Sequence, residues 1–392
     1  MFAQFARLRK FIAWLLFVPL MLTLAGCLGG VPLVGNGPSI NTRAPVPVAL
    51  LVPIGSADGN EQKLAADLEN AARLASSDLS GVQIDLRVYP TAGSPTKAQE
   101  AAQQAVSDGA KIIIGPLRAE SATAAAQAAA GRGVNVLAFS NNSAIAGGNL
   151  FVLGQTFDST ANRLMNYAVT QGKARVLTVY ANTNTGRVGK VAIDRAIANN
   201  GATSAGSISY EFSQQAVINS VTNIRDTARS NQANAIFFTA NTAGALPLFT
   251  QMLPEAGVDP TETQFIGLAR WDTPPQTLEL PGVQGGWFAL PDPQRNAQFR
   301  TRYEAAYGSP PHALAGLAYD GIAAVGALVS SGKSDALTTS GLTQPAGFQG
   351  VNGVFRFMPD GTNERALAVA TVENKQVVVI SPAPTSFGAP GL

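Results

Sequence analysis

The sequence predicts an α/β protein with two parallel-sheet lobes, and three observations support this. Strand-like and helix-like segments alternate along most of the chain. The alternation restarts after residue 150, which indicates two halves of similar size. The chain has 392 residues, enough for about two domains of ordinary size. Parallel strands connected through helices require a sheet that is covered by helices on both faces.

The first half contains four predicted strands and three predicted helices. Residues 46–54 (VPVALLVPI) are apolar and β-branched, which favours a buried strand, and residues 61–79 carry leucine and alanine at helical spacing. Apolar and polar residues alternate at 82–89, as in a strand with one covered face. The remaining predictions are an Ala/Gln helix at 96–108, a strand at 111–116 closed by Gly-Pro, an Ala-rich helix at 119–131 and a strand at 134–139.

The second half repeats this pattern. The predicted strands are 174–180, 207–212, 235–239, 265–267 and 285–289, and the predicted helices are 189–199, 217–230, 243–253, 295–307 and 313–330. Two strand-like runs follow at 353–358 and 366–379. The turn pair Asp360-Gly361 lies between them.

Residues 1–26 are predicted to be a secretory signal. Three basic residues precede an uncharged, almost wholly apolar run of 14 residues at 11–24. A span of the bilayer needs about 20 residues, so the run is too short for a transmembrane helix. Residues 27–45 are rich in Gly, Pro and Asn, which indicates a tether.

The end of the signal, Leu24-Ala25-Gly26-Cys27, resembles the lipobox of bacterial lipoproteins. The resemblance implies cleavage before Cys27 and attachment of lipid to that residue, the only cysteine in the chain. Two or more acyl chains would anchor the protein stably to a membrane. Leu28 follows Cys27. In Gram-negative lipoproteins the signal for retention in the inner membrane resembles Asp at this position, so the resemblance implies a location at the periplasmic face of the outer membrane. The alternative is a plain signal peptide followed by a buried cysteine.

Composition excludes several functional classes. There are 27 basic and 25 acidic residues, and removal of the signal leaves 24 against 25, so no basic field predicts nucleic-acid binding. One cysteine and one histidine exclude a Cys/His zinc site and a disulfide scaffold. The chain has no Gly-x-Ser-x-Gly elbow, P-loop lysine or paired-carboxylate motif. We therefore predict a protein that is not an enzyme and that needs no cofactor and no metal.

Several stretches, taken in order, resemble the type I periplasmic binding proteins of the leucine-binding-protein-like group. They are VALLVPIG, residues 88–141, FFTANTAGALPLFTQMLPEAG, GVQGGWFALPDP, FRTRYEAAYGSPPHALAGLAYDGIAAV and GVFRFMPDGTNERALAV. The resemblance covers residues 46–380 and implies two Rossmann-like lobes joined by a three-crossover hinge. The implied division is 46–153 with 289–335 for lobe one and 154–288 with 336–380 for lobe two. Residues 381–392 are then a flexible tail.

Ligands of open parallel sheets bind where the strands end, because helix N-termini present unpaired amides there. The loops at the predicted strand ends are rich in Ser, Thr, Asn and Gly. Together with the resemblance, this gives the candidate ligand-binding residues Ser121, Ser140, Asn141, Asn142, Ser143, Asn182, Thr185, Arg270, Trp271 and Asp272.

Structural alternatives stand beside these candidates. Ser121 is also explained as a helix cap, and Asn141-Asn142 as a turn. In amino-acid-binding members of the family that the chain resembles, an acidic residue binds the ammonium group of the ligand. The resemblance places the equivalent position near Ala269 in this chain. Arg270 and Trp271 could instead hold an anionic or sugar-like group. The alternative is a tryptophan packed beneath its loop, with a solvated arginine beside it.

Two functions follow from the resemblance. The chain resembles the penicillin-binding protein activator lipoproteins, which implies a regulator whose partner is a penicillin-binding protein, a peptidoglycan synthase. It would correspond to their C-terminal domain alone. The alternative is a substrate-binding lipoprotein for an ABC permease, with an amino acid or a similar small polar ligand.

Overall fold

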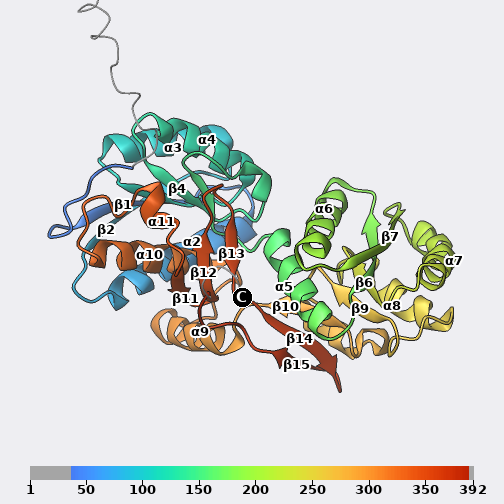
Figure 1. The fold of residues 1–392 in the computed structure, drawn as a ribbon. Helices are drawn as coiled ribbons and strands as arrows, with labels where there is room; N and C mark the ends of the chain where they lie inside the picture. The colour runs from blue at the N-terminus through green and yellow to red at the C-terminus, as the bar shows by residue number, and fades with distance from the viewer. Residues whose placement is uncertain (1–36, 388–392) are drawn as a thin grey trace, which may run out of the picture.

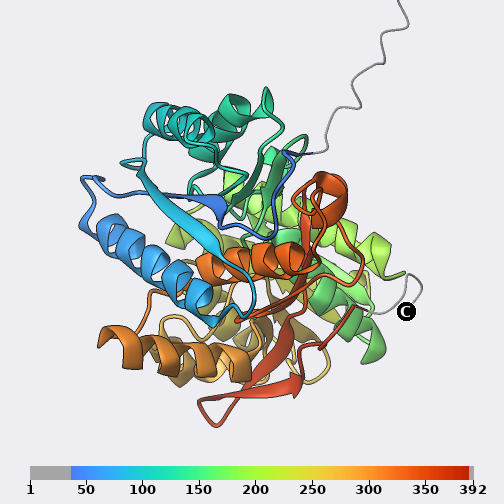
Figure 2. The same ribbon diagram turned by 90° about the vertical axis from the view of Figure 1, so that its left-hand side faces the viewer.

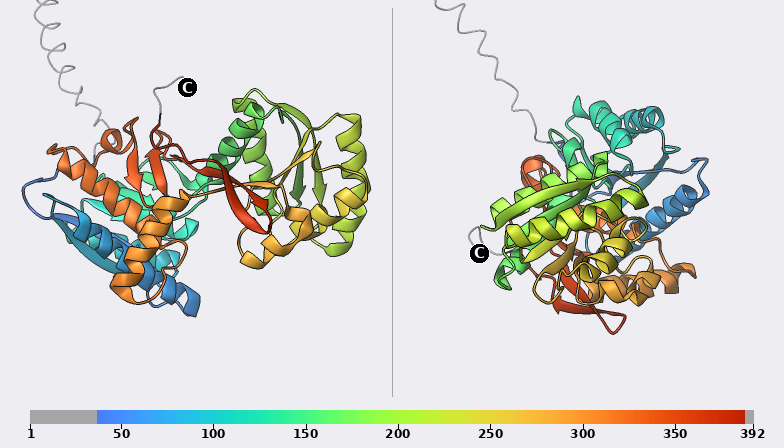
Figure 3. Two further views of the ribbon diagram at one scale, coloured as in Figure 1. Left: turned by 90° about the horizontal axis from the view of Figure 1, so that it is seen from below. Right: turned by 90° about the vertical axis from the view of Figure 1, so that its right-hand side faces the viewer.

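Two lobes lie side by side and are joined by a narrow neck, as Figure 1 shows and as the left view of Figure 3 shows from below. The computed structural model describes residues 37–387. Lobe one is built on a five-stranded sheet and lobe two on a seven-stranded sheet. The predicted signal and Cys27 lie outside the described residues. Within residues 37–387, no helix is both long and apolar enough to span a bilayer.

The sheet of lobe one is wholly parallel, with strand order β2-β1-β3-β4-β5. Strands β1, β3 and β5 read as continuous apolar runs because helices cover both faces, whereas apolar and polar residues alternate in the edge strand β2. Every side chain from Val48 to Val52 in the inner strand β1 is fully buried. The strands are β1 (Val46–Val52), β2 (Ile84–Pro90), β3 (Ile112–Ile114), β4 (Asn135–Ala138) and β5 (Leu150–Val152).

Helices of two kinds cover the two faces of this sheet. On one face α2 (Gly59–Asp78) lies beside α10 (Ala315–Ser330), as Figure 2 shows, and α9 (Pro293–Tyr307) packs against them. On the other face lie α3 (Pro95–Ser107) and α4 (Ala119–Ala130), whose buried side chains are alanines apart from Ser121. Small side chains allow these two helices to approach each other closely.

The sheet of lobe two has strand order β15-β14-β10-β9-β8-β6-β7, and β14 runs antiparallel to both of its neighbours, β10 and β15. The two α/β lobes are confirmed, but this sheet is mixed rather than wholly parallel. Helices α5 (Phe157–Thr170) and α6 (Asn184–Asn199) cover one face. Helices α7 (Gln214–Ser230) and α8 (Leu246–Glu255) cover the other. The strands are β6 (Arg175–Ala181), β7 (Thr203–Tyr210), β8 (Ala235–Phe238), β9 (Gln264–Gly267), β10 (Trp287–Leu290), β14 (Ala368–Glu373) and β15 (Gln376–Ser381).

The division between the lobes differs from the expected one in the C-terminal region. Residues 336–365 belong to lobe one, because Phe348, Phe355 and Phe357 enter its core. They contribute the short helix α11 (Thr339–Leu342) and a separate three-stranded antiparallel sheet. Only β14 and β15 from the predicted range 336–380 join lobe two. The strands of the small sheet are β11 (Phe348–Gly350), β12 (Gly353–Phe357) and β13 (Asn363–Arg365).

Both ends of the described chain are more ordered than predicted. Ile40 lies within the predicted tether, yet its side chain is buried in the core of lobe one and its N–H donates to the Ser334 carbonyl at 2.8 Å. Ser381 ends a strand, and Phe387 lies over the Arg356 guanidinium, 4.6 Å from ring centroid to Cζ. The prediction also missed β5 and α5, which lead into the first connection between the lobes.

Three segments that link one strand or helix to the next connect the lobes, at residues 153–156, 291–292 and 366–367. Arg365, next to the third connection, donates through Nε and Nη2 to the Leu153 carbonyl on the first, at 3.1 and 2.5 Å. Its Nη1 donates to Asp320 at 3.0 Å. The Asn352 carbonyl accepts from the Asp292 N–H on the second connection at 3.2 Å.

Asp320 joins these contacts into one network. Its carboxylate accepts from the Val351 N–H at 2.8 Å and from the Asn352 amide at 3.2 Å, as well as from Arg365. The Asp320 side chain is 0% exposed and the Arg365 side chain 3%. Burial raises the pKa of Asp320, and Arg365 acts in the opposite direction by stabilising the carboxylate. All three connections therefore meet around one buried ion pair.

We expect Arg365→Met to destabilise the fold by about 3–5 kcal/mol, because it leaves the Asp320 charge buried and unpaired. Urea unfolding monitored by circular dichroism measures this. Lys375→Met removes the exposed partner of Glu279 and serves as the control, with an expected cost below about 1 kcal/mol. Equal costs for the two variants would contradict the structural role of the buried pair.

His312, the only histidine, begins the turn before α10. Its side-chain Nδ1 accepts from the Leu314 N–H at 3.2 Å, and its backbone N–H donates to the Asp67 carboxylate at 2.8 Å. Burial lowers the pKa of His312 from 6.5; Asp67 acts in the opposite direction, and Lys63 adds to the lowering. The neutral imidazole is therefore the form that the fold favours.

We expect an NMR titration of the single imidazole to give a midpoint below 6.5 in the folded protein. The unfolded chain then binds more protons than the folded one, so stability falls as pH decreases through 6.5 towards the folded midpoint. His312→Gln should remove this part of the pH dependence of the unfolding free energy. A midpoint at or above 6.5 would contradict the prediction.

Candidate functional site

A cavity of about 730 Å³ lies between the two lobes and is lined by both. This volume is typical of sites for small molecules. Lobe one contributes the loop after β4 and the turn between β12 and β13, and lobe two contributes α5 and α6. The lining residues are Ser143, Ala144, Ala146, Asp360, Thr362 and Asn363 from lobe one, with Asp158, Arg187, Val188, Val191 and Arg195 from lobe two.

The loop after β4 is shaped by its own polar side chains. Ser140 Oγ accepts from the Asn142 N–H at 3.1 Å, and Asn142 Oδ1 accepts from the Ala144 N–H at 3.0 Å. These two local turns lead into the short helix η1 (Ser143–Ile145). Asn142 thus acts as the cap of this helix, and Asn141 is exposed without lining the cavity.

Ser143 connects the lobes directly. Its Oγ donates to Asp158 Oδ2 on α5 at 2.8 Å. Arg195 on α6 donates to the other oxygen, Asp158 Oδ1, at 3.1 Å. The three side chains form a polar chain across the wall of the cavity, and Asp158 and Arg195 compensate each other's charge.

Helix α6 forms the wall of lobe two and starts earlier than predicted. Thr183 is its N-cap and accepts from the Gly186 N–H at 3.0 Å. A Cβ at Gly186 would lie 2.1 Å from the Ala181 carbonyl oxygen, so only glycine permits this close approach of helix to strand. The exposed fractions of Val188 and Val191 are 42% and 44%, and both line the cavity.

Of the predicted ligand-binding residues, only one lines the cavity, and another contacts a lining residue. Ser143 lines it. Asn182 lies behind Arg187, whose Nη1 donates to Asn182 Oδ1 at 3.1 Å, and Asn182 in turn donates to Glu211 at 2.7 Å. Thr185 is exposed in the first turn of α6 but does not line the cavity.

Ser121 lies in the first turn of α4, and its side chain is buried. Its Oγ has no hydrogen-bond partner within residues 37–387. It is not the helix cap, because the N-cap position is Arg118, which provides no capping hydrogen bond. Arg118 instead pairs with Glu61 across the neighbouring loop. Ser121 can contact a ligand only if the covering side chains move.

The predicted role of Trp271 in ligand contact is wrong. Its side chain is 0% exposed in the core of lobe two and stacks on Phe288 with centroids 6.4 Å apart. Arg270 is exposed and forms two hydrogen bonds to Asp272, so these two charges neutralise each other. The structure therefore supports the alternative of a tryptophan packed beneath its loop, and it keeps these three residues out of the cavity.

Sequence reasoning missed the charged and apolar residues of the cavity. Arg187 and Val188 were assigned to a loop, because the helix was predicted to begin at 189. The Thr156 cap followed by Asp158 is a usual helix-start pattern and could have located α5. Asp360 was recognised only as part of a turn. No group of His, Cys, Asp and Glu side chains suited to a metal ion occurs in the described part of the chain.

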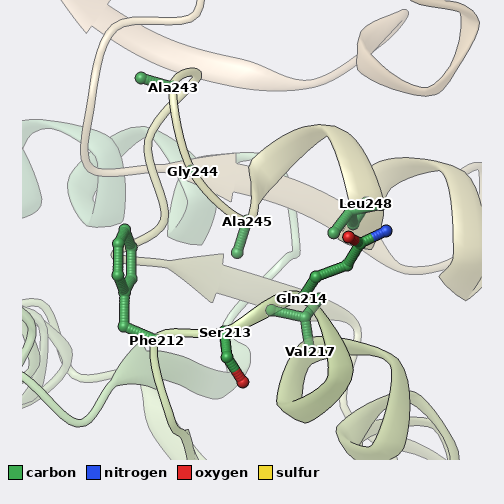
Figure 4. A pocket seen from close by; sticks show the side chains of 8 residues that line it. All are labelled: Phe212, Ser213, Gln214, Val217, Ala243, Gly244, Ala245 and Leu248. Carbon is green, nitrogen blue, oxygen red and sulfur yellow. The ribbon is translucent and has the colours of Figure 1, made fainter.

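A second hollow, of about 310 Å³, lies on the flank of lobe two (Figure 4). Phe212, which is 64% exposed, faces the loop that carries Gly244, while Gln214 and Leu248 close the other end in Figure 4. Because lobe two alone forms this hollow, a ligand in it would not connect the lobes. The interlobe cavity is therefore the stronger candidate.

The model of the periplasmic binding protein family matches residues 45–376. The chain belongs to the periplasmic binding protein family. No curated protein sequence matches the chain significantly. The expected type I periplasmic binding protein fold is confirmed by this match and by solved structures of similar architecture.

The similar structures come from bacterial solute receptors of low identity. A putative branched-chain amino acid ABC transporter protein of Rhodospirillum rubrum has a TM-score of 0.71 at 19% identity and covers 86% of this chain and 100% of its own. A branched-chain amino acid ABC transporter ligand-binding protein of Burkholderia xenovorans gives 0.67 at 17%, covering 88% and 97%. A solute-binding protein of Rhodopseudomonas palustris, in complex with 3,4-dihydroxybenzoic acid, gives 0.58 at 19%, covering 88% and 99%. At such identities the likeness establishes the fold alone.

Two glycines make room for Trp271 in this periplasmic binding protein. A Cβ at Gly286 would lie 1.7 Å from the indole ring, and a Cβ at Gly267 would lie 1.9 Å from Nε1. We expect Gly286→Ala to destabilise the protein by about 1–3 kcal/mol through overpacking. The additional change Trp271→Leu should recover part of this loss. Thermal unfolding of both variants measures the effect.

Gly59→Ala is the matched control, because a Cβ there meets nothing within 4 Å. Its expected effect on stability is within about 0.5 kcal/mol. If Gly286→Ala were equally mild, Trp271 could not occupy the buried position described above.

Proposed function

We propose that this periplasmic binding protein is a solute receptor that binds a small polar ligand between its lobes and delivers it to an ABC permease. The observation that carries the proposal is the cavity lined by both lobes, since a ligand there contacts both halves at once. Further support comes from the neck, where three connections gather around one buried ion pair. Such an arrangement suits hinge motion of two rigid lobes.

The similar solved structures favour the same function. They include two branched-chain amino acid ABC transporter proteins and a solute-binding protein in complex with 3,4-dihydroxybenzoic acid. They give no support to the role of penicillin-binding protein activator that the sequence first suggested. We therefore propose the transport role, with a permease as partner and binding without chemical turnover.

We further propose that Cys27 carries a lipid that holds the protein at the periplasmic face of a membrane. Leu28 favours the outer membrane, whereas delivery to an ABC permease requires access to the inner membrane. The support is the sequence Leu24-Ala25-Gly26-Cys27 followed by Leu28. Labelling of cells with a palmitate analogue, compared between the natural chain and Cys27→Ala, tests the attachment. Density-gradient fractionation of the envelope tests the membrane assignment.

The ligand-binding role is tested by screening amino acids, aromatic acids, sugars and polyamines against the full chain in detergent. A ligand at 100 times its Kd should stabilise the fold by about 2.7 kcal/mol, because it binds only the folded state. Thermal shift identifies the ligand. Hydrogen exchange should then slow in both residues 143–146 and residues 186–191, which lie on opposite walls of the cavity.

Val191→Trp fills the cavity and should abolish binding without unfolding the protein. Val379→Trp is the control, since Val379 is similarly exposed (40%) but lies on β15, outside the cavity. Binding that survives Val191→Trp would place the ligand elsewhere. Absence of any ligand, together with recovery of a penicillin-binding protein in envelope pull-downs, would favour the activator role instead.

A further inference from the structure

The described chain begins on lobe one, at the edge of the sheet where the parallel strands start. A Cβ at Gly37 would lie 2.9 Å from the Leu337 carbonyl oxygen, and the Ile40 N–H donates to the Ser334 carbonyl at 2.8 Å. Figure 2 shows the start of the coloured chain and helix α11 on the same side of the lobe. The position at which the chain leaves lobe one towards Cys27 is therefore fixed.

Two basic residues lie next to this position. Lys333 directly precedes Ser334, the residue that accepts the hydrogen bond from Ile40. Arg132 directly precedes Gly133, where a Cβ would lie 3.7 Å from the Gly37 Cα. Both basic side chains are exposed.

Two more basic residues lie along the same edge of the sheet. Arg43 is exposed shortly before β1, and the half-buried Lys111 directly precedes β3, with its N–H donating to the Pro47 carbonyl at 2.9 Å. Strands β1, β3 and β4 are parallel neighbours, so the residues before them meet at one edge. We call this cluster the basic edge; it consists of Arg43, Lys111, Arg132 and Lys333.

The positive charge of the basic edge is not compensated. Within residues 37–387 none of its four members forms an ion pair. Helices α2 and α3 end at the same edge and β2 begins there, and this brings Asp78, Asp85 and Asp108 close to it. The first two are already paired with other arginines, so only Asp108 and the exposed Asp335 oppose the four cations. The edge therefore carries a net positive charge.

The basic edge is close in the chain to the proposed lipid. Cys27 is ten residues before Gly37, and no acidic residue occurs between them. Ten residues span at most about 35 Å when fully extended. A lipid on Cys27 thus keeps the edge near the headgroups of its membrane. Basic residues are attracted to anionic headgroups over about one Debye length, or about 10 Å at 0.1 M salt.

From this placement we infer that the basic edge is a docking surface for the anionic lipid headgroups of the membrane that carries the protein. The inference rests on the proposed lipid attachment at Cys27 and specifies how the folded part meets that membrane. A lipid chain together with a basic patch holds a protein to a membrane more firmly than the chain alone. The loop that lines the interlobe cavity follows the other end of β4, so docking through the basic edge leaves the cavity accessible.

Fluorescence quenching in vesicles tests the inference. The lipidated full chain is inserted from detergent into vesicles that carry nitroxide headgroups. The vesicles consist of phosphatidylcholine alone, or of phosphatidylcholine and phosphatidylglycerol at about 3:1, which supplies the negative surface charge.

A dye reports the position of lobe one in these vesicles. It is attached to Ser334→Cys at the basic edge or, as the control, to Ser309→Cys. Both serines are exposed, and they lie before and after α10, a helix of 16 residues and about 24 Å. From neutral to anionic vesicles, quenching should rise at least twofold at Ser334→Cys and should not rise at Ser309→Cys.

Charge variants assign this rise to the basic edge. Arg132→Gln combined with Lys333→Gln should abolish it. The control is Lys97→Gln combined with Arg225→Gln, which removes the same charge from two ion pairs outside the edge and should preserve the rise. Arg132 and Lys333 are exposed and form no ion pair within residues 37–387, so the thermal midpoint should stay close to that of the unaltered protein.

The outcomes separate this inference from the lipid attachment. Cys27 is the only cysteine, so a chain that carries lipid there should take no dye unless a serine has been replaced. Dye uptake by the unaltered chain would mean that Cys27 is free, and the attachment and the inference would then fail together. If the unaltered chain takes no dye, equal quenching in neutral and anionic vesicles would overturn the inference alone. An equal loss of the rise in both charge variants would do the same.

Discussion

The ion pair between Asp320 and Arg365 is the interaction on which the arrangement of the lobes depends. Burying two charges is costly unless their hydrogen bonds are satisfied. Here the guanidinium donates to Asp320 and to the Leu153 carbonyl, and the carboxylate also accepts from the backbone of Val351. Because these partners lie on or beside separate connections, the pair fixes the point at which the chain passes between lobes.

The small antiparallel sheet of lobe one follows from the same constraint. Asn352 bonds Asp320 and also the second connection, so β11, β12 and the turn after them must lie beside α10. A side chain at Gly350 would lie 2.3 Å from the Asp320 carboxylate, which explains the glycine at that position. The β12–β13 turn is thereby carried to the interlobe cavity, which Asp360 lines. The buried Asp320–Arg365 pair therefore helps to position Asp360, an exposed residue of the cavity.

Sequence reasoning recovered what depends on local pattern. The buried strands of lobe one were located because a parallel sheet requires long apolar runs, and the Ala-rich helices because their small residues recur at helical spacing. The C-terminal segment was assigned to the wrong lobe, since nothing local shows that Phe348, Phe355 and Phe357 pack against α2 and α10 rather than against lobe two.

The site was harder to predict than the fold. Ser143 could be found because strand-end loops are a general location for ligands. Arg187 and Asp360 could not, since they come together only through the relative placement of two lobes. Trp271 shows the converse error, because an aromatic residue beside an arginine in a loop resembles a binding group until the two glycines that enclose its ring are seen.

The chain returns to lobe one after its last strand. Ala383 packs in the core of lobe two, whereas the Thr385 carbonyl accepts from Gln349 at 3.3 Å and Phe387 covers Arg356, both on lobe one. The C-terminal peptide therefore forms a further link between the lobes, which is held to lobe one by noncovalent contacts and adds to the three connections described above. Any swing of one half relative to the other must stretch or detach it. Shortening the polypeptide by a few residues at this end would thus alter the stiffness of the joint while leaving both halves folded.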